Sequence, residues 1–334
     1  MSFMEREARE APQAAAVFLD RNSKELSALG ARLRQISPPV VVTSGRGSSD
    51  HAAGYFKYLT EILNGVPCAS IGASVVSVYG AKLKLRGALC ITISQSGQSP
   101  DIVALQKAAG DAEALTVAIV NNEDSPAARD ADIFLPLCCG PERSVAATKT
   151  FIVSLIASAA MVAHWLDDKS MISAVNDLPK NLERACQIAW PEFISIGHNA
   201  ESFYILGRGP SLPIAAEAAL KLKETCAIHA EAFSFAEVMH GPLELLVKDF
   251  PVVAFSPEDR SHQLSQVAID KIRKIGADVL VVGKTGLPYS LTSNSLLDPI
   301  AMIQTAYLSI EKLAKARHRN PDEPRYLKKI TETV

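Results

Sequence analysis

The stretch Ala88-Leu-Cys-Ile-Thr-Ile-Ser-Gln-Ser-Gly-Gln-Ser99 joins an apolar run to a turn rich in hydroxyl and amide side chains. Its first six residues are typical of a strand buried on both faces of a parallel sheet. From Pro100 to Ala109 the apolar residues then recur at helical spacing. The stretch therefore predicts a strand, a polar turn and a helix in succession, the building unit of an α/β fold.

The same alternation runs through the first half of the chain. Residues 1–36 have a helical pattern that ends before Pro38 and Pro39. Further helices are expected at Ala52–Leu63 and Thr148–Trp165. Strands are expected at Val40–Thr43, Cys68–Ile71, Ala88–Ile93, Leu115–Val120 and Ile133–Leu137. Alternating strands and helices predict an α/β fold with a parallel sheet flanked by helices on both faces.

The second half repeats this organisation. Gly-Arg-Gly follows an apolar run at residues 45–47 and again at 207–209, an offset near half the chain that favours an internal duplication. Strands are expected at Phe203–Leu206, Val252–Phe255 and Val279–Val282, and helices from about residue 211 through Glu224, at Gln263–Ile275 and at Pro299–Ala316. We predict an N-terminal helical segment (1–36), a first α/β domain (37–166), a helical connector (167–192), a second α/β domain (193–316) and a C-terminal tail (317–334).

Composition narrows the class of protein. The 334 residues are 48% hydrophobic and 21% charged, with a net charge of −2, so no basic field indicates nucleic acid or an anionic membrane as partner. The six cysteines lack CxxC spacing and suit a reducing compartment. The N-terminus lacks the apolar core of a signal peptide, and the apolar run 151–163 is too short to span a bilayer. We expect a cytoplasmic protein without metal or cofactor.

Two turns of the first half are candidates for binding a phosphate group. One holds Gly47, Ser48 and Ser49, and the other holds the run from Ser94 to Ser99. Both follow predicted strands, and open parallel sheets bind ligands at the carboxyl ends of their strands. Neither turn is a Walker loop or a dinucleotide fingerprint. The alternative is that these serines cap the next helix. The turn after Val252–Phe255 is acidic, so one phosphate per chain is expected.

A candidate acid/base cluster lies in the second half. Lys221 and Glu224 are three residues apart on a predicted helix and so share a face. His240 follows, with Gly241-Pro242 favouring a loop that presents it near a surface. A carboxylate and a histidine can move protons between the carbons and oxygens of a sugar, and a lysine can stabilise an enolate-like oxygen. The alternatives are a solvated ion pair and a locally bonded histidine.

The chain resembles the sugar isomerase (SIS) family over about residues 30–334. Within it, the chain is similar to the isomerase half of glucosamine-6-phosphate synthase and to stand-alone amino-sugar-phosphate deaminases. The motifs that carry the resemblance are Gly45-Arg-Gly-Ser-Ser49, Ser94-Gln-Ser-Gly-Gln-Ser99, Ser144-Val-Ala-Ala-Thr-Lys149, Leu220-Lys-Leu-Lys-Glu224, His229-Ala-Glu-Ala232, Met239-His-Gly-Pro-Leu243 and Pro324-Arg-Tyr-Leu-Lys-Lys329. It implies two tandem SIS domains.

The resemblance also implies a role for each site residue. Glu224 matches the family's proton-transfer base, Lys221 its partner for a substrate oxygen, and His240 a ring-opening histidine donated by the neighbouring subunit of a homodimer. Lys329, or its neighbour Lys328, matches a tail lysine that forms a Schiff base with the open-chain ketose. The positions matching phosphate ligands are Ser49, Ser94, Gln95, Ser96 and Ser99, and those matching sugar contacts are Ser48, Val145 and Ala147. Ala147 replaces a serine of the synthase pattern.

The resemblance implies an enzyme that converts glucosamine 6-phosphate to fructose 6-phosphate and ammonia. We expect no glutaminase domain, because no cysteine precedes Cys68. The alternatives within the family are a phosphosugar isomerase, a galactosamine-6-phosphate deaminase or a fructosamine-6-phosphate deglycase. A third class, a sugar-phosphate sensor that binds DNA, is disfavoured because residues 1–36 are mixed in charge.

Overall fold

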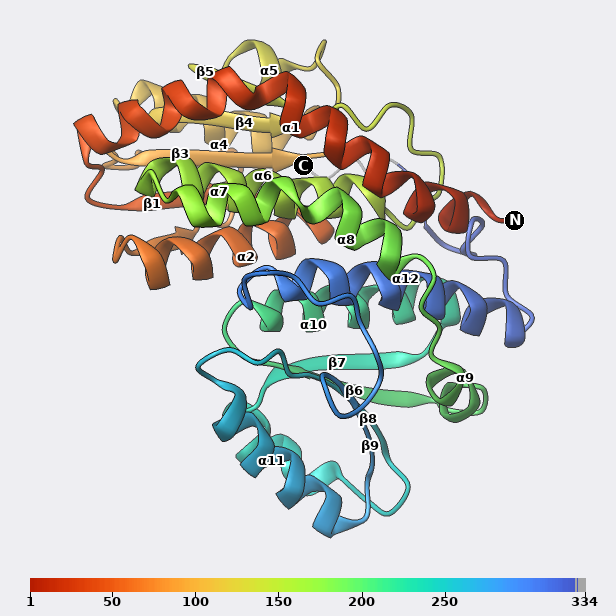
Figure 1. Cartoon of the computed structure of the whole chain (residues 1–334). Helices are drawn as coiled ribbons and strands as arrows, with labels where there is room; N and C mark the ends of the chain where they lie inside the picture. The colour runs from red at the N-terminus through yellow and green to blue at the C-terminus, as the bar shows by residue number, and fades with distance from the viewer. Residues whose placement is uncertain (328, 330–334) are drawn as a thin grey trace. The chain divides into compact units, whose positions relative to one another are not determined.

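The computed structural model describes residues 1–327 and Lys329 (Figure 1). It divides into two compact units. The C-terminal unit comprises Met1–Pro12, Arg143–Thr148 and Asp177–Leu327, and the N-terminal unit comprises Gln13–Glu142, Lys149–Asn176 and Lys329. The long helix α1 (Phe3–Ile36) contributes residues to both units, which the sequence pattern of a single N-terminal helix did not reveal.

The N-terminal unit contains a parallel sheet of five strands in the order β2-β1-β3-β4-β5. The strands are β1 (Val41–Ser44), β2 (Cys68–Ser70), β3 (Leu89–Ser94), β4 (Leu115–Val120) and β5 (Ile133–Pro136). Each predicted strand of the first half is confirmed within one residue at either end. β1, β3 and β4 are buried along their whole length, as expected of strands covered on both faces.

Six helices of this unit follow α1: α2 (Ser48–Leu63), α3 (Ser74–Ser77), α4 (Pro100–Asp111), α5 (Pro126–Arg129), α6 (Lys149–Leu166) and α7 (Lys169–Asn176). α2 packs on β1 and β3 and against α6, whereas α4 packs on β3 and β4 and against α3 and α5. α6 is long and apolar enough to cross a membrane, but 89% of it is buried, which is typical of a core helix. The predicted buried helix at this position is confirmed.

The C-terminal unit contains a second parallel sheet, in the order β7-β6-β8-β9. Its strands are β6 (Ser202–Gly207), β7 (His229–Ser234), β8 (Pro251–Phe255) and β9 (Asp278–Val282). Three of them were predicted, but the edge strand β7 was missed. In β7 the exposed His229 and Glu231 alternate with the buried Ala230, a period of two that is typical of an edge strand.

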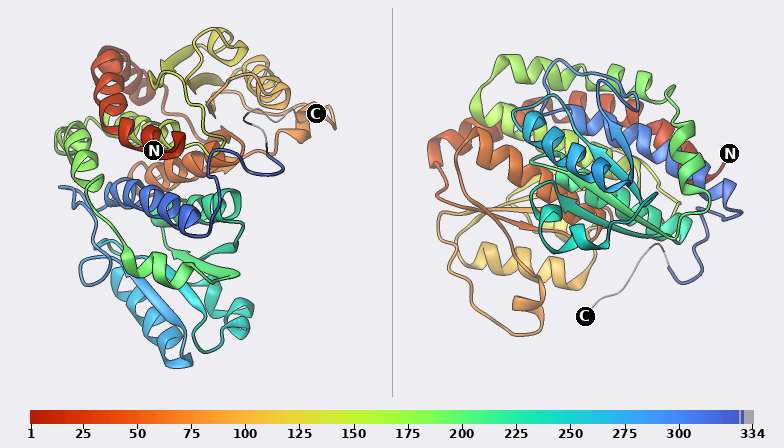
Figure 2. Two further views of the ribbon diagram at one scale, coloured as in Figure 1. Left: turned by 90° about the vertical axis from the view of Figure 1, so that its right-hand side faces the viewer. Right: turned by 90° about the horizontal axis from the view of Figure 1, so that it is seen from below.

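The helices of this unit are α8 (Leu178–Ala185), α9 (Pro191–Gly197), α10 (Ser211–Lys221), α11 (His262–Ile275) and α12 (Asp298–Ala316). The four-stranded sheet lies between α10 and α12 on one side and α11 on the other (Figures 1 and 2). α12 is buried along almost its whole length and packs against α10 and α8. Two parallel sheets flanked by helices thus confirm the predicted fold class.

The repeated glycines perform the same steric task in the two units. A Cβ atom on Gly45 would lie 2.9 Å from the backbone of Ser49 and Asp50. A Cβ atom on Gly207 would lie 2.4 Å from the carbonyl oxygen of Ser211. In both cases the first turn of the following helix folds back onto the end of the strand. Only glycine leaves room for this turn, which explains why the first glycine of the motif recurs.

We expect Gly207→Ala to lower the free energy of unfolding by about 2–3 kcal/mol, because the added methyl group collides with backbone atoms that cannot rotate away. Gly209→Ala is the control. Gly209 has a φ of 57° but no atom within 4 Å of an added Cβ, so it should cost only about 1 kcal/mol. Urea unfolding checks both values, and equal losses for the two variants would contradict the steric explanation.

Candidate functional site

The two predicted phosphate-binding turns lie at the point where the strand order of the N-terminal unit reverses. The chain passes from β1 outward to β2 and returns on the other side of β1 to form β3. Ser44 at the end of β1 is paired in register with Thr92 of β3. Ligands of open α/β sheets bind outside the carboxyl ends of the strands at such a reversal. The turns after β1 and β3 flank this point.

The hydroxyl groups of the second turn shape the loop without capping the helix that follows. Ser94 Oγ accepts a hydrogen bond of 2.9 Å from the Gly97 N–H, and Ser96 Oγ accepts one of 3.3 Å from the Gln98 N–H. Ser99 occupies the N-cap position of α4, but its side chain makes no capping hydrogen bond. Helix capping therefore does not account for Ser99.

The structure brings the five predicted phosphate ligands and Ser48 to one edge of one sheet. Ser48 and Ser49 begin α2 after β1, and their N-cap is Gly47, which has no side chain to cap with. Ser49, Gln95 and Ser96 are partly exposed. The N-termini of α2 and α4 also lie at this edge, and their helix dipoles add partial positive charge that favours an anion. Phosphate binding at these residues stays a prediction.

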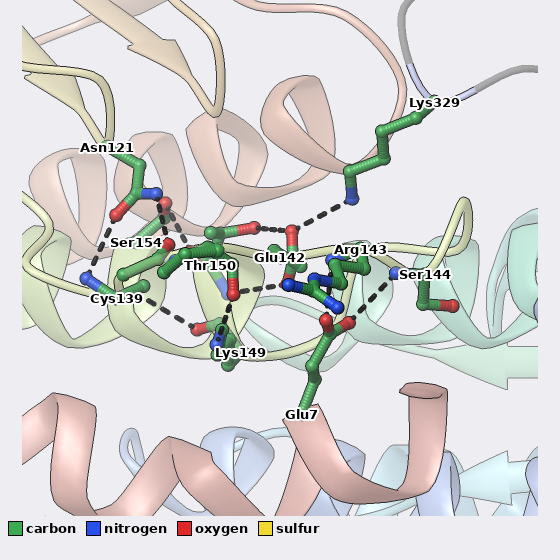
Figure 3. Close-up of polar contacts among 12 residues, drawn as sticks. Glu7, Asn121, Cys139, Glu142, Arg143, Ser144, Lys149, Thr150, Ser154 and Lys329 are labelled. Atoms are coloured by element: carbon green, nitrogen blue, oxygen red, sulfur yellow. Dashed lines mark hydrogen bonds and ion pairs between the residues drawn. The ribbon is translucent and has the colours of Figure 1, made fainter. Parts of the chain in front are cut away.

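The predicted sugar-contact segment, residues 143–148, belongs to the C-terminal unit and is held by Glu7 of α1. The buried Glu7 carboxylate accepts hydrogen bonds from the backbone N–H groups of Arg143 (2.5 Å) and Ser144 (3.1 Å), as Figure 3 shows. Val145 and Ala147 are partly exposed, whereas the residues between and beside them are buried. Glu7 therefore holds the backbone of this segment in place, and the side chains of Val145 and Ala147 remain partly accessible to solvent. Nothing in the sequence pattern singled out Glu7.

The predicted helix through Glu224 is wrong in one respect that matters for the site. α10 ends at Lys221, and the chain continues as a π-helical turn, Leu222–Cys226, before Ala227 adopts a left-handed conformation. π-helical turns are rare and frequent at functional sites. Lys221 and Glu224 nevertheless share a face, as predicted, with Lys221 Nζ 2.5 Å from Glu224 Oε2.

Lys221 is the centre of a buried charge network. Its side chain is 1% exposed, and its Nζ also lies 3.4 Å from the fully buried carboxylate of Glu217. Glu217 accepts a hydrogen bond of 2.9 Å from the Tyr307 hydroxyl of α12. Burial alone would lower the pKa of Lys221, but the carboxylates of Glu217 and Glu224 outweigh it and raise the pKa above its usual value. The alternative of a solvated surface pair does not describe this arrangement.

Glu224 is the member of this network that reaches open space. Its side chain is 18% exposed and lines a pocket of about 720 Å³ within the C-terminal unit. Lys223, Arg319 and Arg325 place cationic groups on the wall of the same pocket. Lys221 lies behind Glu224 and does not line it, so the predicted contact of Lys221 with a substrate oxygen stays a prediction. The remaining walls are formed by Leu220, Thr225, Ala227 and most of the segment 317–327.

His240 lies away from this pocket. It is exposed between two short 3₁₀ helices, Glu237–Met239 and Gly241–Leu245, on the predicted loop. It is not among the residues that line the pocket. Its exposure suits a side chain that acts outside its own chain, and its donation to a partner subunit stays a prediction. Among the residues that the structure describes, no group of three or more His, Cys, Asp or Glu side chains could hold a metal ion.

The tail residue Lys329 contacts a buried carboxylate of the N-terminal unit. Lys329 Nζ lies 3.2 Å from Glu142 Oε2, and the Glu142 side chain is fully buried (Figure 3). Glu142 also accepts hydrogen bonds from the N–H and hydroxyl of Thr150, in the first turn of α6. The charged sequence of the tail predicts a fully exposed segment, but the side chain of Lys329 is only 24% exposed. The alternative lysine, Lys328, lies outside the described residues.

Comparison with known proteins identifies the family. The model of the SIS domain matches residues 37–164 and 198–288, one segment for each parallel sheet. Together these segments make up more than half of the chain. The chain therefore belongs to the SIS domain family, and the two matched segments confirm the predicted tandem arrangement.

The curated relatives include glutamine–fructose-6-phosphate aminotransferases (isomerizing). The protein of Halobacterium salinarum is 32% identical over 302 residues, covering 85% of this chain and 50% of the relative. The protein of Sulfolobus acidocaldarius is 31% identical over 342 residues, covering 99% of this chain and 56% of the relative. The chain thus spans about half the length of the curated relatives it matches.

Solved structures share the fold over nearly the whole chain. A protein of Silicibacter pomeroyi DSS-3 assigned as a phosphosugar isomerase has a TM-score of 0.93 at 40% identity, with 96% of this chain and all of that chain covered. Glucosamine-6-phosphate deaminase from Thermotoga maritima has a TM-score of 0.79 at 20% identity, covering 99% of this chain and 100% of that one. At 20% identity, the similarity to the Thermotoga maritima protein shows a shared fold only.

We expect Lys221→Met to destabilise the protein by about 3–5 kcal/mol, because it removes the ammonium group that lies 3.4 Å from the buried carboxylate of Glu217. The double variant Lys221→Met/Glu217→Gln should recover at least half of the loss, since the amide removes the buried negative charge. Lys284→Met is the control, because Lys284 and Glu258 form an exposed pair in the same unit. Urea unfolding measures all three, and a double variant no more stable than the single one would contradict the network.

Proposed function

We propose that this chain is a phosphosugar isomerase that acts on an amino-sugar phosphate, releasing ammonia from glucosamine 6-phosphate to give fructose 6-phosphate. One observation carries the proposal: Glu224 opens onto a pocket while the buried ammonium of Lys221 supports its carboxylate from behind. A carboxylate held in this way is suited to carrying a proton between adjacent carbons. The family membership and the likeness to the Silicibacter pomeroyi protein support the same reaction class.

The proposed reaction assigns one task to each group. Glu224 takes the proton from carbon 2 of the open-chain amino sugar and returns it to carbon 1. A second proton passes from the amine to the oxygen on carbon 1, so that the amino aldose becomes the carbon 2 imine of the ketose. The amine of Lys329 then adds at carbon 2 and displaces ammonia, and water hydrolyses the lysine imine to release fructose 6-phosphate. The sum is glucosamine 6-phosphate plus water giving fructose 6-phosphate plus ammonia. The serine turns are proposed to hold the phosphate, with Ser48, Val145 and Ala147 contacting the sugar.

His240 is proposed to open the sugar ring, and its exposed loop supports donation to a second copy in a homodimer. Glu142 is proposed to hold the tail lysine near the start of α6 between turnovers, because its buried carboxylate lies 3.2 Å from Lys329 Nζ. No cofactor is required by any of these steps.

The central test is the activity itself. We expect the purified protein to release ammonia and fructose 6-phosphate from glucosamine 6-phosphate in equal amounts. Glu224→Gln should lower kcat by about 10²–10⁴-fold with little effect on folding, because the amide cannot accept the proton. Glu192→Gln makes the same chemical change on the exposed surface of α9 and should leave kcat unchanged.

Assay of related substrates distinguishes the alternatives within the family. Ammonia from galactosamine 6-phosphate, or an amine from a fructosamine 6-phosphate, in preference to glucosamine 6-phosphate would replace the proposed substrate. Interconversion of hexose phosphates without any ammonia would replace the proposed reaction. Full activity of Glu224→Gln on every substrate would remove the proposed base.

The tail lysine is tested separately by trapping. We expect borohydride to fix fructose 6-phosphate covalently to Lys329 in the wild-type protein, because reduction makes an imine permanent. Peptide mass spectrometry locates the adduct, and Lys329→Arg should abolish it whereas Lys284→Arg should not. An adduct on Lys328 would move the role to that residue, and no adduct under turnover conditions would remove the lysine imine from the proposed reaction.

A further inference from the structure

An ion pair joins the two serine-containing turns of the N-terminal unit. Arg46 lies in the turn after β1, and Asp101 lies in the first turn of α4, after β3. Arg46 Nε lies 2.9 Å from Asp101 Oδ2, and the Nη2 group contacts the same oxygen. The pair therefore bridges the two sides of the strand-order reversal, the place where a ligand of this sheet is expected.

The two partners are buried to different extents. The Asp101 side chain is fully buried and its other carboxylate oxygen accepts the Ile102 N–H at 2.8 Å. A buried carboxylate is costly unless it is paired, so Asp101 fixes the near edge of the guanidinium. The Arg46 side chain remains 52% exposed. A ligand in solvent can therefore reach the Arg46 side chain while Asp101 holds it in place.

The guanidinium has donors to spare. Arginine carries five N–H groups, and Asp101 engages two of them. In the part of the chain that the structure describes, no other acceptor contacts Arg46. Planar guanidinium groups that present N–H groups in a fixed fork suit phosphate oxygens.

Charge balance in the two turns gives the same result. Between residues 45 and 50 and between residues 94 and 101, Arg46 is the one cationic side chain, against the carboxylates of Asp50 and Asp101. A phosphate monoester approaching serines and a glutamine in these turns would otherwise meet two like charges and no opposite one. Arg46 supplies the single positive charge of these turns and offsets one of the two carboxylates.

We propose that Arg46 is a direct ligand of the substrate phosphate and that Asp101 is the positioning residue that aims it. This rests on the proposed binding of a sugar phosphate at the serine turns, and it adds a charged contact to a site otherwise made of neutral donors. The ligand class is a phosphate monoester dianion, because the fixed fork offers several N–H groups to more than one oxygen. Arg46 contributes to binding and does not take part in the proton transfer at Glu224.

The test measures dissociation constants of inorganic phosphate and glucosamine 6-phosphate by calorimetry on the full chain, with thermal unfolding of each unliganded variant alongside. Arg46→Gln should weaken both ligands by about 10- to 100-fold and raise KM far more than it lowers kcat. Arg46→Lys should weaken them less, since the charge stays but the fork is lost. Arg86→Gln is the matched control: it removes one arginine at the opposite end of β3, from an exposed pair with Glu113.

The double variant Arg46→Gln/Asp101→Asn distinguishes two roles of Arg46: binding the phosphate directly, or only neutralising the charge of Asp101. It also removes the buried carboxylate that could misfold the single variant. A direct ligand predicts that the double variant still binds phosphate at least about 10-fold more weakly than the wild type. Wild-type affinity in Arg46→Gln, or its full return in the double variant, would overturn the proposal. If the wild type does not turn over the amino sugar but Arg46→Gln still weakens phosphate binding, the proposal for Arg46 holds and the proposed function is wrong. If the wild type binds neither ligand, both are wrong.

Discussion

Parallel pairing is the constraint on which the candidate site depends. It brings the carboxyl ends of all strands in a sheet to one edge, and reversal of the strand order at β1 and β3 separates the helices that follow them. Polar turns fifty residues apart in the sequence consequently become neighbours. The second sheet reverses its order at β6 and β8, but there the Ser211 hydroxyl bonds to Arg208 and to the carbonyl of Phe255. The same topology thus presents partly exposed serines such as Ser49 and Ser96 in one unit and a buried, internally bonded Ser211 in the other.

Buried charge is used in both units to fix flexible groups. Lys221 is enclosed by two carboxylates, Glu142 holds the tail lysine, and Asp101 holds Arg46. In each case one charged group is almost fully buried, and another group of the same network is partly exposed to solvent: Glu224, Lys329 or Arg46. Removing the buried partner's counter-charge is costly, so the exposed group stays where it is placed. Charges held in advance lose little freedom when a ligand arrives, which favours tight binding of charged groups.

The sequence predicted the strands of the first half closely because each is a short β-branched run between turn residues. It missed β7, in which the exposed His229 and Glu231 alternate with the buried Ala230, because this alternation covers only three residues. It also missed the π-helical turn after Lys221, since no local pattern separates one extra residue per turn from an ordinary helix. The sequence also did not indicate the structural roles of three glutamates, because each contacts a residue far away in the chain. They are Glu7, Glu142 and Glu217.

The sequence by itself determined the class of fold, the serine turns and the pairing of Lys221 with Glu224, because these depend on residues a few positions apart. The duplication was also readable, because a local motif recurs after a similar strand in each half. Periodicity and turn chemistry act at that range. Tertiary structure alone decided which of these groups are buried, which face a pocket and which oppositely charged partner each one meets. Burial and pairing depend on contacts between distant segments, and the free energy of a charged group changes most with those contacts.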